Sequence, residues 1–214
     1  MKRHGFYGLT AVVFLLALTA CNDDDETGTP YPSVVTEMAD MHTDGNGAVE
    51  RILTDNGDCF YLTNPRQGYS PLAVYRGLCG YVETTSSGKE RRARLATLRS
   101  VRLLRDSTAI PQRTDPIRAV SVWRGGEYIN LMLSPRTQGG TQYWGYRIDS
   151  LKERNHRKHW YLSLHHGQNG DPESYSETLY ASLWLKSLPE AAPGDSLWLT
   201  VPTPAGLKTW DFIY

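Results

Sequence analysis

The fold is set by Ile117-Arg118-Ala119-Val120-Ser121-Val122-Trp123, which is followed by Arg124-Gly125-Gly126 and then by Tyr128-Ile129-Asn130-Leu131-Met132-Leu133. Short runs rich in β-branched, aromatic and aliphatic residues, separated by glycine, are typical of antiparallel strands joined by turns. This stretch therefore predicts a β-hairpin with one apolar face.

The rest of the C-terminal half repeats this pattern. Further strands are predicted at residues 142–148, 160–164, 179–185, 197–201 and 207–214, with breaks that contain Gly and Pro between them. About seven short strands at this spacing favour an antiparallel β-sandwich over residues 117–214.

The region before the sandwich, residues 34–107, predicts a small barrel. Asn56-Gly57 is a strong hairpin signal, and a second hairpin is expected around a turn at residues 85–88. The segment 91–105 is ambiguous, because its leucines and valine recur every three residues, as in a helix, but also fit one face of a strand. With a turn before it we favour the strand. About five strands make a closed barrel of the OB kind, joined by a proline-bearing linker at 108–116.

The N-terminus has the pattern of an export signal. Lys2 and Arg3 precede an apolar run that ends in Leu18-Thr19-Ala20-Cys21. The run is too short for a transmembrane helix and fits a signal peptide over residues 1–20. Its end resembles the lipobox of bacterial lipoproteins, which implies that Cys21 carries diacylglycerol and that its amine is acylated, palmitate being the label to look for.

Residues 21–33 are expected to form an acidic tether behind that cysteine. The run Asn22-Asp23-Asp24-Asp25-Glu26 resembles the export signal of surface-displayed lipoproteins, although acidic residues also simply keep a tether solvated. We expect an outer-membrane lipoprotein that is surface-exposed, with a periplasm-facing location as the alternative.

Taken together, these motifs resemble the NigD-like family of bacterial lipoproteins. The resemblance rests on the lipobox at residues 18–21, on Asp115-Pro116-Ile117 with the strand that follows, and on Glu127-Tyr128-Ile129-Asn130-Leu131. It implies an N-terminal OB-fold module and a C-terminal β-sandwich. The family takes its name from a bacteriocin operon and brings no catalytic residue with it.

Charge and composition argue against nucleic acid as a partner. The 214 residues contain 23 Lys and Arg against 23 Asp and Glu, so the chain has no basic excess. Several arginines gather between Arg91 and Arg105, but no aromatic residues lie among them to stack on bases.

No motif of known catalytic chemistry is present, so we predict a protein that is not an enzyme and uses no cofactor or metal. Strand geometry places His159 and His165 about 20 Å apart, too far to bind one ion. Arg157 and Lys158 beside the histidines also disfavour a cation. Paired carboxylates of a hydrolase stay open, although the acidic residues are scattered: Asp149, Asp171, Glu173, Glu177 and Asp195.

Two cysteines remain once Cys21 is lipidated. Cys59 and Cys79 would form a disulfide in the oxidising compartment beyond the inner membrane, or would be two separate buried thiols. The sequence leaves both alternatives open.

A binding face is predicted opposite the aliphatic stripe of the sandwich strands. If the leucines point inwards, a set of polar and aromatic residues points outwards: Asn130, Tyr143, Arg147, Tyr161, Tyr180, Trp184 and Trp198. Grouped Tyr and Trp mark recognition surfaces, so this face would contact an envelope protein or a glycan. The alternatives are cross-strand aromatic pairs and a face covered by the N-terminal module.

Three functions follow from these observations. The first is an outer-envelope lipoprotein that acts by non-covalent binding, in an accessory or recognition role. The second, suggested by the family name, is self-protection associated with a bacteriocin. The third is an uncharacterised hydrolase.

Overall fold

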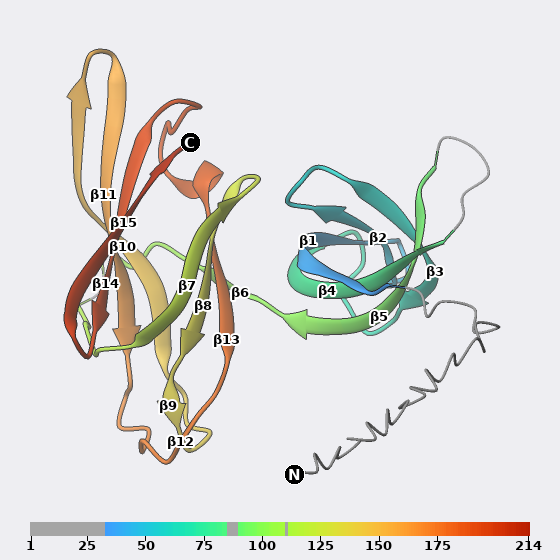
Figure 1. The fold of residues 1–214 in the computed structure, drawn as a ribbon, viewed down its shortest axis with the longest axis horizontal. Coiled ribbons are helices and arrows are strands. Elements are labelled where there is room, and N and C mark those ends of the chain that lie inside the picture. The colour runs from blue at the N-terminus through green and yellow to red at the C-terminus, as the bar shows by residue number, and fades with distance from the viewer. Residues whose placement is uncertain (1–32, 85–89, 110) are drawn as a thin grey trace, which may run out of the picture. The chain divides into compact units, whose positions relative to one another are not determined.

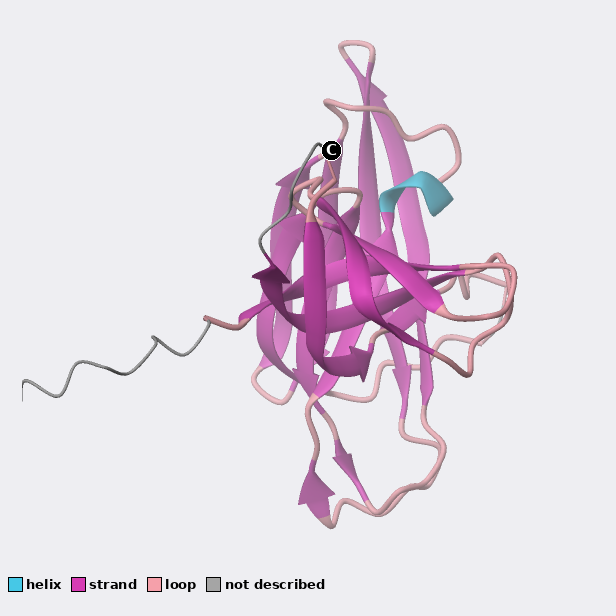
Figure 2. Cartoon of the chain, turned by 90° about the vertical axis from the view of Figure 1, so that its right-hand side faces the viewer, coloured by secondary structure: helices cyan, strands magenta, loops and turns pink. Residues whose placement is uncertain are grey.

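The computed structural model describes residues 33–214, except 85–89 and 110. The predicted signal peptide, Cys21, most of the tether and the predicted turn at 85–88 lie outside the described residues. Strands make up almost all of the regular structure, and they build a closed barrel followed by two packed sheets (Figures 1 and 2). The predicted all-β class is confirmed. Among the described residues there is no helix of the length and hydropathy that crossing a membrane requires.

The barrel contains five strands in the closed order β1-β2-β3-β5-β4. They are β1 (Val35–Thr43), β2 (Val49–Thr54), β3 (Cys59–Arg66), β4 (Val74–Thr84) and β5 (Arg92–Ser100). Neighbours are antiparallel except β3 and β5. The turn between β2 and β3 contains Gly57 with φ 88°, a conformation that glycine adopts without strain. The predicted small barrel of the OB kind is therefore present.

The ambiguous segment at residues 91–105 forms strands and not a helix. Ala93 and Leu95 of β5 face the barrel core, at the two-residue spacing of a strand. The predicted end of the barrel at residue 107 lies too far along the chain. Residues Arg102–Leu104 form β6, which pairs in parallel with a sandwich strand and so belongs to the sandwich.

The sandwich consists of two four-stranded sheets. The first has the order β6-β13-β8-β7, with β7 (Arg118–Gly125), β8 (Tyr128–Ser134) and β13 (Leu179–Trp184). The second has the order β10-β11-β14-β15, with β10 (Tyr143–Arg154), β11 (Arg157–Gly167), β14 (Ser196–Thr203) and β15 (Gly206–Ile213). Two short strands, β9 (Arg136–Thr137) and β12 (Tyr175–Ser176), pair with each other, and η1 (Leu185–Ser187) is one turn of 3-10 helix. Pairing is antiparallel except for β6 with β13 and β11 with β14.

The core of the sandwich lies between the two sheets, because alternate side chains of each strand point inwards. In β8, Ile129, Leu131 and Leu133 are fully buried. They pack with inward residues of the second sheet, which include Trp160, Leu162, Leu164, Leu197 and Leu199. The strand alternation predicted these leucines.

The predicted linker is hydrogen-bonded to the second sheet near both of its ends. Ile148 N donates to Thr108 Oγ1 at 3.0 Å, and Asp115 N donates to His166 O at 3.1 Å. The segment therefore runs beside β10 and the end of β11, which fixes it to the second sheet.

Candidate functional site

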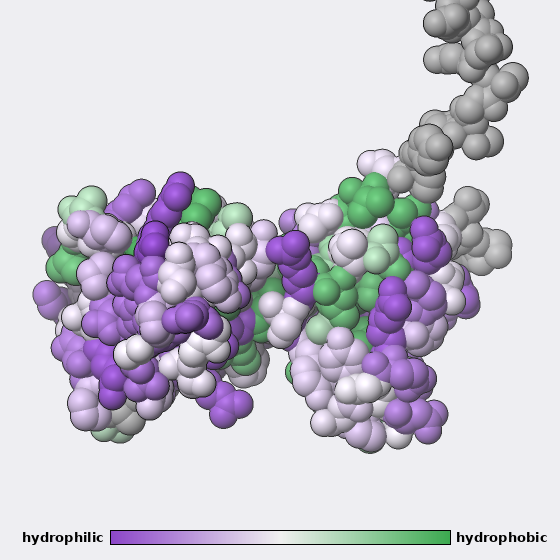
Figure 3. Space-filling model, turned by 90° about the horizontal axis from the view of Figure 1, so that it is seen from below, coloured by the Kyte–Doolittle hydropathy of each residue, from purple (hydrophilic) through white to green (hydrophobic). Residues whose placement is uncertain are grey.

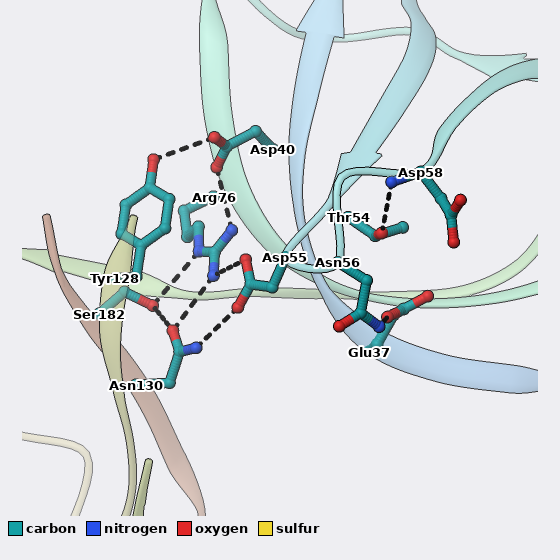
Figure 4. A network of polar contacts seen from close by, with 10 residues as sticks. All are labelled: Glu37, Asp40, Thr54, Asp55, Asn56, Asp58, Arg76, Tyr128, Asn130 and Ser182. Atoms are coloured by element: carbon teal, nitrogen blue, oxygen red, sulfur yellow. Dashed lines mark hydrogen bonds and ion pairs between the residues drawn. The ribbon is translucent and has the colours of Figure 1, made fainter. Parts of the chain in front are cut away.

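A buried polar network surrounds Arg76 where the barrel meets the first sheet of the sandwich (Figure 4). The side chain of Arg76, on β4, is 3% exposed. Its Nη1 donates to Asp40 Oδ1 at 3.1 Å, and its Nη2 donates to Asp55 Oδ1 at 2.6 Å. The guanidinium also reaches the sandwich: Nη2 donates to Asn130 Oδ1 at 3.1 Å, and Nε donates to Ser182 Oγ at 3.3 Å.

The sandwich side of this network is equally well bonded. Asn130 Nδ2 donates to Asp55 Oδ2 at 2.7 Å, and Ser182 Oγ donates to Asn130 Oδ1 at 2.7 Å. The hydroxyl of Tyr128 donates to Asp40 Oδ2 at 3.0 Å, while the guanidinium carbon of Arg76 lies 3.8 Å from the centroid of the Tyr128 ring. We call these six residues the Arg76 network: Asp40, Asp55, Arg76, Tyr128, Asn130 and Ser182.

Burial and the single cation of the network, Arg76, together set the pKa values of its acidic groups. Burial raises the pKa of Asp55, and the neighbouring Arg76 opposes that rise. Burial, followed by the charge of Asp40, raises the pKa of the Tyr128 hydroxyl, which keeps it a donor. One guanidinium thus compensates two carboxylates, and loss of Arg76 would leave both of them without a counter-charge.

Two adjacent glycines allow the β7–β8 turn to approach the barrel closely. A Cβ on Gly125 would overlap the carboxylate of Asp55 and would lie 2.8 Å from Asn130 Nδ2. Gly126 has φ 53°, and a Cβ there would lie 2.9 Å from the backbone oxygen of Asp55. The sequence predicted the turn, but the contact with Asp55 came only from the structure.

An apolar groove lies on one side of Arg76. It has a volume of about 290 Å³, and its apolar lining is Met41, Tyr69, Val74, Tyr75, Leu98, Val101 and Leu103. Val74 is 57% exposed and Leu103 is 44% exposed, so the lining is open to solvent. Figure 3, which views the molecule from below, shows apolar residues gathered on the visible face of the barrel.

The seven residues of the predicted binding face do not share one face, which corrects that prediction. Asn130 is fully buried in the Arg76 network and is not exposed. Tyr180 and Trp184 lie on the same face of β13 as Ser182, the face that meets the barrel at Arg76. Strand alternation reveals which residues share a side of one strand, but it does not reveal which sheet that strand joins.

The remaining four residues lie on the second sheet. Tyr161 of β11 and Trp198 of β14 are paired in register, and their rings stack with centroids 4.9 Å apart. They form the cross-strand aromatic pair that was the alternative to a binding face. Tyr143 lies at the start of β10 beneath the guanidinium of Arg113, and Arg147 donates to the backbone oxygen of Ser107 at 3.2 Å.

Cys59 and Cys79 are free thiols, so the disulfide between them that the sequence left open is not formed. Cys79 faces the barrel core from β4, and Cys59 begins β3. The strands β3 and β4 are not neighbours, since β5 lies between them in the barrel. Burial raises the pKa of the Cys79 thiol to about 12.

The histidines are separate in their contacts. His159 stacks on Trp198, His165 Nδ1 lies 2.5 Å from Ser107 Oγ, and His166 contacts Asp115 O and Gln142. Within residues 33–214, leaving aside 85–89 and 110, no three His, Cys, Asp or Glu side chains group so as to hold a metal ion. Burial lowers the pKa of both His165 and His166.

Comparison with solved structures shows the same fold in bacterial proteins. A NigD-like immunity protein from Bacteroides caccae ATCC 43185 is 23% identical, with a TM-score of 0.67 over 86% of this chain and 98% of that one. A protein named as toxin-related, from Parabacteroides distasonis ATCC 8503, is 17% identical, with a TM-score of 0.68 over 85% and 93%. A protein named as a lipoprotein, from Bacteroides fragilis NCTC 9343, is 10% identical, with a TM-score of 0.56 over 86% and 97%.

A search of curated proteins found no match to the chain. A family model is more informative, because it describes the NigD-like C-terminal beta sandwich domain and matches residues 103–214. The match begins within β6, the strand that the structure assigns to the sandwich. The match extends over more than half of the 214 residues, and the chain therefore belongs to the NigD-like family.

Proposed function

We propose that this protein is an envelope lipoprotein that binds a protein partner non-covalently through the apolar groove beside Arg76. The observation that carries the proposal is the exposure of large apolar side chains at and near this groove. Leu72 is 82% exposed, two residues before Val74, which is 57% exposed. Apolar groups that gather on a surface in this way mark interaction sites.

The backbone at Leu72 supports the same site. Leu72 has φ 52°, in the left-handed region that a bulky residue rarely occupies. The hydrogen bond from its N–H to Asp44 O, at 3.0 Å, holds it there. A residue keeps a strained backbone conformation only where the surrounding structure holds it in place, and such residues cluster at sites that clamp ligands.

The Arg76 network gives the groove a fixed wall. Arg76 lines the groove and is held by four partners at once. A wall that is ordered before binding lowers the entropic cost of association. A partner that presents apolar side chains is the occupant that this lining favours.

Membrane attachment through Cys21 completes the proposal. The lipobox-like end of the signal sequence supports it, as does the fold shared with a protein named as a lipoprotein. Two or more acyl chains hold a protein on a bilayer stably. We propose the outer membrane, and protease treatment of intact cells distinguishes the surface-exposed location from the periplasm-facing one.

Affinity capture from intact cells tests the groove. The lipidated full chain is crosslinked in its native envelope, and partner recovery is compared with that of a Val74→Asp, Leu103→Asp variant. Because these side chains supply the apolar contact, we expect at least a tenfold loss of recovered partner. Leu207→Asp is the matched control, since Leu207 is 77% exposed on β15. Equal recovery from all three proteins would contradict the proposed groove.

A second function is favoured by the comparison with the NigD-like immunity protein of Bacteroides caccae. In that case the bound partner would be a bacteriocin, and binding would protect the producing cell. A strain without the gene would then become sensitive to the bacteriocin, and the Val74→Asp, Leu103→Asp variant would fail to restore protection. Unchanged sensitivity of the deletion strain would exclude this role.

A further inference from the structure

A second cleft lies in the sandwich, and none of its lining residues belongs to the apolar groove beside Arg76. Its volume is about 460 Å³, within the range of small-molecule sites. Its polar lining includes Arg118, Ser134, Arg136, His166, Glu173 and Ser176. We call it the end cleft, since these residues lie where β7 begins and where β8 and β11 end.

The wall of the end cleft is fixed by the carboxylate of Asp171. This side chain accepts hydrogen bonds from the hydroxyl of Thr137, from Gln138 N at 2.9 Å and from Gly140 N at 3.0 Å. These bonds, led by that from Thr137, lower the pKa of Asp171 to about 2. The segment that carries Arg136 is therefore tied down immediately after that arginine.

The same network fixes His166. Gln142 Nε2 donates to Asp171 Oδ2 at 2.8 Å, and the Oε1 of Gln142 lies 3.1 Å from His166 Nε2. The other ring nitrogen lies 2.8 Å from Asp115 O, and the ring stacks on Trp144 with centroids 4.3 Å apart. Burial lowers the pKa of His166, which favours the neutral ring.

The two arginines of the end cleft differ in their partners. Arg136 donates from Nε and Nη2 to Glu173 O, and Glu173 Oε2 lies 3.6 Å from Arg136 Nε. Arg118 makes no ion pair with any residue that the structure describes, although it is exposed at the cleft. Arg118 thus lines the cleft together with Ser134 and Ser176, and its charge has no ion-pair partner among the described residues.

We propose that the end cleft binds a sugar that carries a carboxylate, of the uronic acid class. The guanidinium of Arg118 matches a carboxylate in geometry and in charge. The serine hydroxyls supply donors and acceptors for sugar hydroxyls. Pro116, Ile117 and Pro204 add an apolar part of the lining, against which the C–H face of a sugar ring packs.

Titration with methyl glucuronide, followed by amide NMR shifts of the folded protein, tests this site. We expect saturable shifts at residues 117, 118, 134, 136 and 176, while methyl glucoside, which lacks the carboxylate, binds at least tenfold more weakly. Arg118→Gln should weaken glucuronide binding by tenfold or more. Arg154→Gln is the matched control, since Arg154 lies at the far end of β10 and should leave binding unchanged.

Three results of this titration would overturn the proposal. Equal binding of the glucoside and the glucuronide would show that Arg118 does not select a carboxylate. Equal binding of N-acetylglutamate would assign the cleft to peptide carboxylates instead of sugars. No shifts at the cleft residues would remove the site altogether, and none of these results bears on the apolar groove.

Discussion

Replacement of Arg76 by methionine should destabilise the protein far more than replacement of an exposed arginine. Methionine retains much of the apolar length of the side chain but removes the charge that compensates Asp40 and Asp55. Breaking a buried ion pair by removal of one partner costs about 3–5 kcal/mol, because the other charge stays buried. For a chain of this size the melting temperature should fall by roughly 6–20 °C.

The assay can separate the two parts of the chain. All 6 tryptophans lie at or after Trp123, so their fluorescence reports on the sandwich alone, while far-ultraviolet circular dichroism reports on both parts. If Arg76 holds the barrel and the sandwich together, the thermal unfolding transitions followed by fluorescence and by circular dichroism coincide in the wild type. In the Arg76→Met variant the two transitions should separate.

A control and a second variant make the role of the ion pair refutable. Arg99→Met removes an exposed arginine of β5 and should change stability by no more than about 0.5 kcal/mol. Asp55→Asn added to Arg76→Met should recover part of the loss, since it removes one of the uncompensated charges. A loss of less than about 1 kcal/mol for Arg76→Met, or no recovery in the double variant, would refute the role assigned to the ion pair.

Three further predictions concern the packing, the buried histidines and the thiols. Gly125→Ala should lower the free energy of unfolding in urea by about 1–3 kcal/mol, because its Cβ would overlap Asp55, and an unchanged value would contradict that contact. Burial lowers the pKa values of His42, His165 and His166 in the folded state. Their stabilising contribution is present above the unfolded value near 6.5 and is lost as the pH falls below it, so the urea midpoint should drop between pH 7 and about pH 5. Without reductant, iodoacetamide should modify Cys59 in the native protein and Cys79 only after unfolding, and a mass lower by two hydrogens would show a disulfide instead.

The sequence predicted the strands well, because one face of each strand is buried. The two-residue alternation identified Leu131 and Leu133 as inward, and Asn56-Gly57 identified the first hairpin. The sequence did not predict that β6 joins the sandwich, since a parallel pairing of three residues leaves no local signal.

The functional surfaces were predicted less well, because they depend on contacts between distant parts of the chain. Arg76 meets Asn130 and Ser182 across sequence separations of 54 and 106 residues. Because Asn130 alternates with inward leucines, the sequence pattern assigns it to the outer face of its strand, together with exposed aromatic residues. The pattern is the same whether that outer face contacts solvent or another domain, so it could not predict that Asn130 is buried. The Gly-Gly turn near Asn130 is a local sign of a close approach, but from sequence alone it indicates only a turn.

The most direct test of the proposed function is site-specific photocrosslinking at Val74 in living cells. A photoreactive amino acid placed there should give one discrete crosslinked product with a partner protein, while the same amino acid at Leu207 should not. The product should disappear when Leu103→Asp is added. Identical products from both positions, or none from Val74, would contradict binding at the groove.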